Sequence, residues 1–203
     1  RWEPGQPGEE RRVEVELKLI ADVGLVGEPN AGKSTFLAAV SEARPKVADY
    51  PFTTLTPNLG IVELSDFRTL AVADIPGIIE GAREGKGLGL QFLRHIERTR
   101  TLALLIPVNV PDPRSVYREL RAELTSYSHE LEIRPHCVVL TKTDLLGQDD
   151  SLPEIDAPDA WASFAVSSVS RDGLSTLLEE LWQRTREETE KENRSGEEDP
   201  WTP

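Results

Sequence analysis

A glycine-rich octapeptide near the start of the chain restricts its fold more than any other feature. Residues 27–34 read GEPNAGKS and fit the pattern G-x-x-x-x-G-K-[ST]. The apolar run at residues 19–26 predicts a buried strand before it, and the following residues predict a helix that begins within the loop and continues to about Glu42. Backbone N–H groups of such a loop and of the helix start converge on anions. The arrangement predicts a phosphate-binding loop in an α/β domain.

Each part of this loop has a chemical role in holding the phosphates of a nucleotide. Gly32 lets the chain approach the anion closely, Lys33 brings a positive charge between the β- and γ-phosphates, and the Ser34 hydroxyl is a candidate Mg²⁺ ligand. A chance glycine-rich turn is the alternative, and the strand and helix in register with the motif argue against it. The loop by itself does not separate a GTPase from an ATPase or a kinase. The predicted phosphate-site residues are Gly27, Glu28, Pro29, Asn30, Ala31, Gly32, Lys33, Ser34 and Thr35.

The rest of the chain alternates apolar runs with helical patterns, which is typical of βαβ units and a mainly parallel sheet. Residues 59–64 and 69–73 are close enough in sequence to form an antiparallel hairpin. Further strands are predicted at 101–108, 136–140 and 162–166. Helices are predicted at 90–99, at 114–128 and from about residue 174. We therefore predict a three-layer α/β/α architecture with a mostly parallel sheet and one antiparallel strand.

A second motif closes the apolar run at residues 70–73 and consists of Asp74, Ile75, Pro76 and Gly77. An aspartate at a strand end can reach Mg²⁺ through a water molecule, and Gly77 can present its backbone N–H to the γ-phosphate. An ordinary strand-to-turn aspartate is the alternative. The distance from the phosphate loop, in a βαββ arrangement, favours the functional interpretation.

Residues 50–54, between these two motifs, lack helix and strand periodicity. Adjacent threonines in such a loop can supply a hydroxyl to Mg²⁺ only while a γ-phosphate is present, which predicts an order–disorder switch. We predict Thr54 as the metal ligand, with Thr53 as the alternative. The nucleotide contacts predicted for this segment are Phe52, Thr53, Thr54, Leu55 and Thr56.

Hydrolysis is predicted to be slow, with Lys33, Thr54 and Gly77 as the catalytic residues. Many GTPases place a glutamine after the glycine to orient the attacking water, whereas this chain has Ile78, which cannot hydrogen-bond a water. Asn30 is a candidate ligand for K⁺, which would take the place of a positively charged finger. A loop-stabilising role for Asn30 is the alternative, and both interpretations stay open.

A third motif, Thr141, Lys142, Thr143 and Asp144, follows an apolar strand and fits [NT]-K-x-D. The Asp144 carboxylate can accept two hydrogen bonds from the N1–H and exocyclic amine of guanine, and adenine lacks that donor pair. The stem of Lys142 can lie against the base. A later loop of Ser167, Ser168 and Val169 can offer backbone N–H groups to guanine O6. Together the motifs predict a guanine-nucleotide site at the carboxyl ends of the strands.

Charge and composition exclude several other classes of function. The net charge of −13 argues against a general electrostatic grip on nucleic acid. No apolar run approaches the roughly 18 residues that a membrane span needs, which predicts a protein without a membrane partner. The single cysteine, Cys137, lies in an apolar run and is predicted to be a buried, inert thiol, which favours a reducing cytoplasm.

The two ends of the chain differ from its centre. Residues 1–14 are rich in proline, glycine and charge and are predicted to be a linker from a missing N-terminal domain, consistent with a chain that contains no methionine. Residues 187–203 are strongly acidic and are predicted to form a disordered tail.

Segments outside the general motifs resemble the Obg family of GTPases, also called CgtA. The resemblance is carried by residues 27–34, 48–60, 74–82 and 87–99. It is close from about residue 15 to residue 100 and looser from there to the last helix. The family implies a P-loop NTPase fold, a Ras-like G domain of the Obg type over residues 15–186. The chain departs from the family pattern at Glu28, at Thr141 and at residues 107–112.

The resemblance implies a GTP-binding protein that uses Mg²⁺, hydrolyses GTP slowly and acts as a switch in 50S ribosomal subunit assembly and stress control. Its implied ligands are GTP, GDP and guanosine tetraphosphate, and its implied partners are rRNA and ribosomal proteins, with the chain itself a monomer. A predicted helix over residues 91–100 carries Arg94, His95, Arg98 and Arg100 and can meet rRNA or a ribosomal protein, or can present a solvated face. One alternative is a nucleotide-gated binding module whose hydrolysis is incidental. Another, an adenine-nucleotide kinase or ATPase, requires a different role for Asp144.

Overall fold

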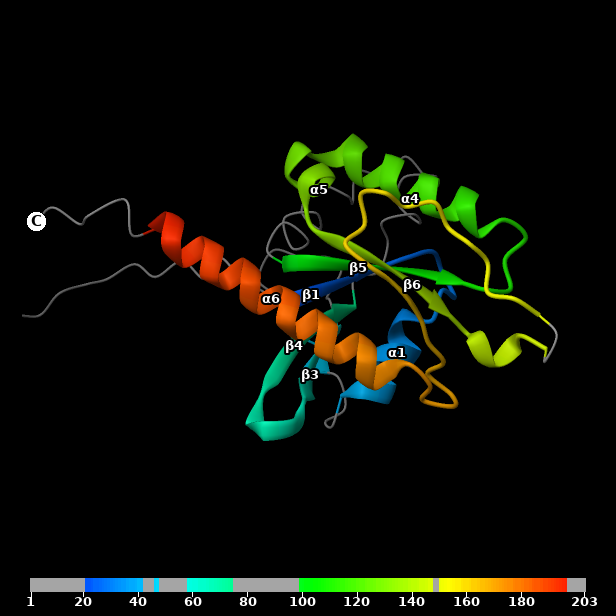
Figure 1. The fold of residues 1–203 in the computed structure, drawn as a ribbon, viewed down its shortest axis with the longest axis horizontal. Coiled ribbons are helices and arrows are strands. Elements are labelled where there is room, and N and C mark those ends of the chain that lie inside the picture. The colour runs from blue at the N-terminus through cyan, green and yellow to red at the C-terminus, as the bar shows by residue number, and fades with distance from the viewer. Residues whose placement is uncertain (1–20, 42–45, 48–57, 75–98, 148–149, 197–203) are drawn as a thin grey trace, which may run out of the picture.

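The computed structural model describes residues 21–41, 46–47, 58–74, 99–147 and 150–196 (Figure 1). The described residues form one seven-stranded sheet in the order β2-β3-β4-β1-β5-β6-β7. The strands are β1 Ala21–Val26, β2 Lys46–Val47, β3 Asn58–Glu63, β4 Thr69–Asp74, β5 Thr99–Pro107, β6 His136–Thr141 and β7 Ser163–Ala165.

All neighbouring strands from β4 to β7 pair in parallel, whereas β3 pairs antiparallel with both β2 and β4. The predicted hairpin is therefore confirmed, with Glu63 opposite Thr69 at its closed end. The predicted mostly parallel sheet with one antiparallel strand is also confirmed. The two-residue strand β2 was not predicted, because two residues carry no readable periodicity.

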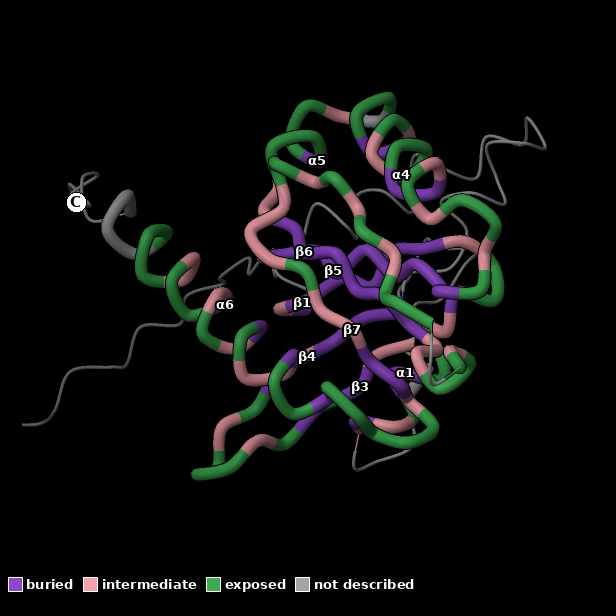
Figure 2. Tube along the Cα trace, turned by 45° about the vertical axis from the view of Figure 1, so that its right-hand side comes forward, coloured by how far each residue is buried: buried purple, intermediate pink, exposed green. Residues whose placement is uncertain are grey.

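Helices cover both faces of the sheet, as the three-layer prediction requires (Figure 1). One face packs against α4 Pro113–Tyr127 and α5 His129–Ile133, and the other against α1 Lys33–Val40 and α6 Leu174–Gly196. Figure 2 shows the buried residues concentrated along the central strands. In β6 all six residues are buried, since parallel strands are covered on both faces.

Two predicted boundaries are wrong. The helix predicted for residues 90–99 cannot include Thr99, because Thr99 is the first residue of β5 and pairs with Ala21 of β1. The other residues of that prediction, 90–98, lie outside the described part of the chain. The disordered tail predicted from residue 187 is helical as far as Gly196, where α6 ends.

The acidic end of α6 is helical because its charges are paired at helical spacing. Arg184 lies 3.0 Å from Glu188, Arg186 lies 3.1 Å from Glu190, and Lys191 lies 2.8 Å from Glu188. Glutamate, lysine and arginine are also good helix formers. A high acidic content therefore marks a solvated helix here, and composition alone does not reveal the pairing.

Cys137 is buried in β6, as predicted, and burial raises the pKa of its thiol, so it is a poor nucleophile. No helix among the described residues is long and apolar enough to cross a membrane.

Candidate functional site

The sheet brings the described parts of the predicted motifs to one edge. The phosphate loop follows β1, Asp74 ends β4, Thr141 ends β6, and Ser167 follows β7 two residues after its end. These strands run parallel to one another, so their carboxyl ends meet at the same edge, where open α/β sheets bind ligands.

Backbone geometry explains both glycines of the phosphate loop. Gly32 has a φ of 99°, a left-handed conformation that disfavours a side chain. A Cβ on Gly27 would lie 2.6 Å from the carbonyl oxygen of Leu105 in β5, so the loop can pass β5 only with glycine there. Asn30 is exposed and also has a positive φ, 63°, which asparagine tolerates better than most residues. The loop conformation is thus encoded by three residues of the motif.

Lys33 and Ser34 start α1 and turn back toward the strands. The Lys33 ammonium donates to the carbonyl oxygens of Gly27 at 2.7 Å and Glu28 at 3.0 Å, which fixes its charge over the beginning of the loop. The Ser34 hydroxyl donates to Asp74 Oδ2 at 2.6 Å. Two motifs separated by 40 positions are therefore in direct contact.

The Asp74 carboxylate fits a hydrated Mg²⁺ site. Asp74 is only 2% exposed, and its Oδ1 has no hydrogen-bond partner among the described residues. A buried carboxylate oxygen without a partner is costly unless a cation or an ordered water satisfies it. Hydroxyl and carboxylate oxygens are the ligand types that Mg²⁺ prefers.

Thr141 joins the base-recognition motif to the phosphate loop. Its buried hydroxyl donates to the Ala31 carbonyl oxygen at 2.7 Å, and its carbonyl accepts from the amide of Val108. Lys142 follows in a left-handed conformation with a φ of 60°. The threonine that departs from the family pattern thus keeps a bond between the two loops.

Asp144 is positioned by the last loop through a side chain. The Ser167 hydroxyl donates to Asp144 Oδ1 at 2.6 Å and accepts from the amides of Val169 and Ser170. The sequence predicted that the amides of Ser167 and Val169 would donate to the base. In the structure, the Ser167 amide instead donates to the carbonyl oxygen of Asp172, and the Val169 amide donates to the Ser167 hydroxyl. Among the described residues, the Ser168 amide has no hydrogen bond, so it is the one of the three still available to a ligand.

Gly173 and Asp172 contribute to this loop and were missed. Gly173 has a φ of 72°, and a Cβ there would clash with the carbonyl oxygen of Ala165. Asp172 accepts the Ser167 amide through its carbonyl and the Ser170 hydroxyl through its carboxylate. The Asp-Gly pair at the start of α6 was the available signal, because it is typical of a turn.

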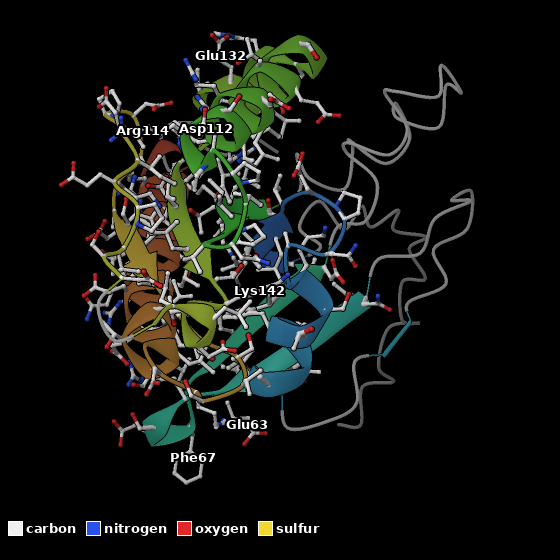
Figure 3. The ribbon with its side chains drawn as sticks, turned by 90° about the vertical axis from the view of Figure 1, so that its right-hand side faces the viewer. Glu63, Phe67, Asp112, Arg114, Glu132 and Lys142 are labelled. Carbon is white, nitrogen blue, oxygen red and sulfur yellow. The ribbon has the colours of Figure 1, made fainter. Side chains whose placement is uncertain are left out.

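Residues 107–112, which depart from the family pattern, contain a residue with a structural role. Asp112 accepts hydrogen bonds from the amides of Arg114 and Ser115 and is the N-cap of α4, with Pro113 as the first helical residue (Figure 3). The aspartate therefore starts a helix.

Several predicted site residues lie outside the described residues. They are Phe52, Thr53, Thr54, Leu55, Thr56, Ile75, Pro76, Gly77 and Ile78, together with Arg94, His95 and Arg98. Arg100, predicted on the same helix, lies instead in β5 and forms an ion pair with Asp22 at 2.7 Å. Among the residues that are described, no cluster of three or more His, Cys, Asp or Glu side chains could hold a metal ion. A magnesium site here would therefore rest on one carboxylate, hydroxyls and phosphate oxygens.

Solved structures with the same fold include the G domain of the T. maritima FeoB iron transporter, with a TM-score of 0.55, 20% identity and coverage of 80% of this chain and 96% of that one. They also include Era in complex with MgGDPNP and a segment of 16S ribosomal RNA, with a TM-score of 0.60, 21% identity and coverage of 83% and 57%. At these identities the likeness shows the fold alone.

Sequence comparison is more specific. The family described as "50S ribosome-binding GTPase" matches residues 22–142. GTPase Obg of Chlorobaculum tepidum is 54% identical over 182 residues, which cover 90% of this chain and 54% of the relative. GTPase Obg of Chlorobium chlorochromatii is 56% identical over 180 residues, which cover 89% and 53%. The chain spans about half the length of the curated relatives it matches. It belongs to the 50S ribosome-binding GTPases and, within them, to the Obg family.

Proposed function

We propose that this domain binds GTP and GDP with Mg²⁺, hydrolyses GTP slowly and acts as a switch in assembly of the large ribosomal subunit and in growth control. The observation that carries the proposal is the contact between Ser34 and Asp74, with a buried Asp74 oxygen that has no partner among the described residues. A hydroxyl and a carboxylate that meet beside a phosphate loop are suited to a magnesium–nucleotide complex.

In the proposed complex the chain supplies position and charge. The loop amides and Lys33 would hold the phosphates, while Ser34 and Asp74 would hold the metal, Asp74 through a water. Bound Mg²⁺ would supply charge neutralisation at the β- and γ-phosphates. Thr54 and Gly77 would complete the site at the γ-phosphate. Replacing Ser34 with alanine should weaken GDP binding in magnesium and leave binding in EDTA nearly unchanged.

Guanine preference is proposed to rest on Asp144, held by Ser167. An adenine nucleotide would leave this carboxylate without its donor pair. Titration with GDP and with ADP at millimolar magnesium tests the proposal, and equal affinities would overturn it.

Exchanging the donors and acceptors of the base contact is a sharper test. Asp144→Asn should lose affinity for GDP and gain affinity for xanthosine diphosphate, whose base presents an acceptor at the position of the guanine amine. A change of roughly a hundredfold in the ratio of the two affinities corresponds to one hydrogen bond of about 1.4 kcal/mol lost with GDP and one gained with xanthosine diphosphate. Asp66→Asn, on the distant hairpin turn, is the matched control and should leave the ratio unchanged.

The slow rate is proposed from Ile78, which cannot orient a water. K⁺ held by Asn30 is one proposed compensation, and the positive φ of Asn30 supports the alternative, a role in the loop conformation. Single-turnover hydrolysis in K⁺ and in Na⁺ buffers separates them. Equal rates in the two buffers leave only the conformational role.

The ribosomal role is proposed from the family description and from the Era complex, whose partner is a ribosomal RNA. Turnover of the full-length protein with and without 50S subunits tests it. Strong stimulation supports a GTPase switch, whereas nucleotide-dependent docking without stimulation supports the second candidate, a nucleotide-gated binding module. Guanosine tetraphosphate as a further ligand and the cytoplasm as the compartment belong to the same proposal.

A further inference from the structure

In the described part of the connection from β6 to β7 there is no α-helix of the kind that usually makes such a crossover. Parallel neighbours are normally joined through a helix that packs on the sheet. Here the one regular element in the described part of the connection is a 3-10 turn, Thr143–Leu145, and the remainder crosses as an extended chain, coloured yellow in Figure 1. The sheet surface that a crossover helix would cover is therefore crossed only by a non-helical segment of the chain.

An apolar cavity of about 590 Å³ lies in that place. We call it the crossover groove: its floor is Val138 and Leu140 of β6 with Ala165 of β7, and its wall is Leu152 and Ile155 of the crossover. Its volume lies within the range of about 300–1,000 Å³ that is usual for binding sites. Leu152 is 48% exposed at the rim, so the groove is open to solvent.

The groove is kept open by bonds at both ends of its wall. Arg114, at the start of α4, donates from Nε to the carbonyl oxygen of Glu154 at 2.8 Å (Figure 3). Asp159 accepts from the Tyr117 hydroxyl at 2.5 Å and from Arg121 Nε at 2.8 Å. Because α4 fixes the chain on both sides of Ile155, the wall cannot easily collapse onto the floor.

The crossover segment that forms the wall of the groove is acidic, and Arg114 is the one basic side chain among the described residues that line the groove. Residues 143–170 contain no lysine or arginine. They contain six acidic residues, which are Asp144, Asp149, Asp150, Glu154, Asp156 and Asp159. Glu154 and Asp156 line the groove itself and are exposed. Such a field repels nucleic acid and attracts a cationic partner.

We propose that the crossover groove binds a basic amphipathic helix of a protein partner. The helix would take the place of the missing crossover helix, with apolar side chains against Leu140, Ala165 and Leu152 and with lysines or arginines toward Glu154 and Asp156. Apolar anchors in a groove with charges at the rim are the usual form of helix-in-groove recognition. The site is separate from the nucleotide residues, so it does not depend on the proposed GTPase cycle.

A synthetic amphipathic helix of leucine and lysine is the probe, and the same pattern of leucine and glutamate is its control. Calorimetric titration of the full chain should show binding of the lysine peptide alone. In ¹⁵N spectra, the amides of residues 138–140 and 150–165 should shift. Leu152→Glu should weaken binding at least about tenfold, the equivalent of 1.4 kcal/mol. Ile133→Glu is the control, since Ile133 is an exposed apolar residue on α5, away from the groove, and it should have no effect.

A second pair of variants keeps the test independent of the apolar contact. Glu154→Lys with Asp156→Lys should abolish binding, whereas Glu130→Lys with Glu132→Lys, which changes the net charge equally on α5, should not. The proposal is overturned if both charge variants act alike, if the glutamate peptide binds as well, or if the shifts fall elsewhere. Binding of a fatty acid in the groove without peptide binding would also overturn it.

Discussion

At the scale of single residues, Thr141 shows how a departure from a family pattern keeps its structural role. Its hydroxyl makes one 2.7 Å bond to the Ala31 carbonyl, and both residues are buried. A buried carbonyl that loses its donor costs more than a surface one, because water cannot replace the bond. The bond fixes the distance between the base-recognition motif and the phosphate loop.

Thr141→Val keeps the shape of the side chain and removes this donor. We expect it to lower the free energy of unfolding by about 1–3 kcal/mol and to weaken GDP binding. Thr125→Val, on α4, is the control, since it lies outside the predicted nucleotide motifs and its hydroxyl makes no hydrogen bond among the described residues. Denaturant unfolding and GDP titration measure the two effects. Equal losses in the two variants would contradict the assigned role.

Phe67 is the most exposed apolar residue described and lies at the tip of the β3–β4 hairpin (Figure 3). Its φ of 60° is left-handed, a conformation that costs a side chain about 1–2 kcal/mol. Phe67→Gly removes that cost without loss of buried surface, so we expect about 1 kcal/mol of stabilisation in denaturant unfolding. Asp66→Gly should gain less, because aspartate tolerates a positive φ better. A destabilised Phe67→Gly variant would contradict this.

At the scale of elements, one arginine ties the β3–β4 hairpin to α6. The Arg68 guanidinium donates to both carboxylate oxygens of Glu179, at 2.7 and 3.0 Å, and lies 4.5 Å from the centre of the Trp182 ring. The hydrogen bond from Arg68 holds the pKa of Glu179 below its usual value. A lysine can neither bind both oxygens in this geometry nor stack on the ring in the same way.

Arg68→Lys should therefore lower the midpoint of thermal unfolding. Because the folded-state pKa of Glu179 is depressed, its contribution is present above the ordinary glutamate pKa of about 4.3 and is lost as the pH falls through the folded value. The difference from the wild type should shrink in acid and at roughly 1 M salt, where charges are screened beyond about 3 Å. Arg118→Lys, at an exposed site on α4, should change the midpoint less. If the difference in unfolding midpoint between Arg68→Lys and the wild type depends on neither salt nor pH, the effect comes from packing alone.

At the scale of the whole molecule, the polar residues at the amino ends of the parallel strands differ in role from those at the carboxyl ends. Thr141 ends β6 at the nucleotide edge, whereas His136 begins β6 at the other edge, buried against Tyr117, Arg121 and Asp159. Burial lowers the pKa of His136, and the charge of Arg121 lowers it further against the opposing effect of Asp159. The folded protein therefore binds a proton on this histidine only at a lower pH than the unfolded chain does.

This network predicts how stability depends on pH. The unfolded chain binds the His136 proton below about pH 6.5, while the folded chain takes it up only at a lower pH, so stability falls as the pH drops below about 6.5. His136→Gln keeps a polar group beside Tyr117 and removes the titration, so its unfolding free energy should change less over that interval. His129→Gln, on the surface of α5, should keep the wild-type slope. Identical slopes in all three proteins would contradict the prediction.

Much of the architecture could be predicted because its signals are local. Alternating apolar runs and helical patterns predicted the mostly parallel sheet, and the short interval between two runs predicted the hairpin. The end of α6 was missed because composition does not reveal ion pairs at helical spacing. The hydrogen bond from the Ser167 side chain to Asp144 was missed because the local sequence of neither loop shows how close the two loops lie.

The sequence by itself determined the phosphate loop, since glycine, lysine and serine at fixed spacing set both the backbone conformation and the charge of one continuous segment. Only the tertiary structure decided which distant groups meet. Ala31 and Thr141 are separated by 110 positions, and Arg68 and Glu179 by 111. These contacts depend on a strand order that places β1 between β4 and β5. Strand order follows from packing the whole chain at once, which no local pattern specifies.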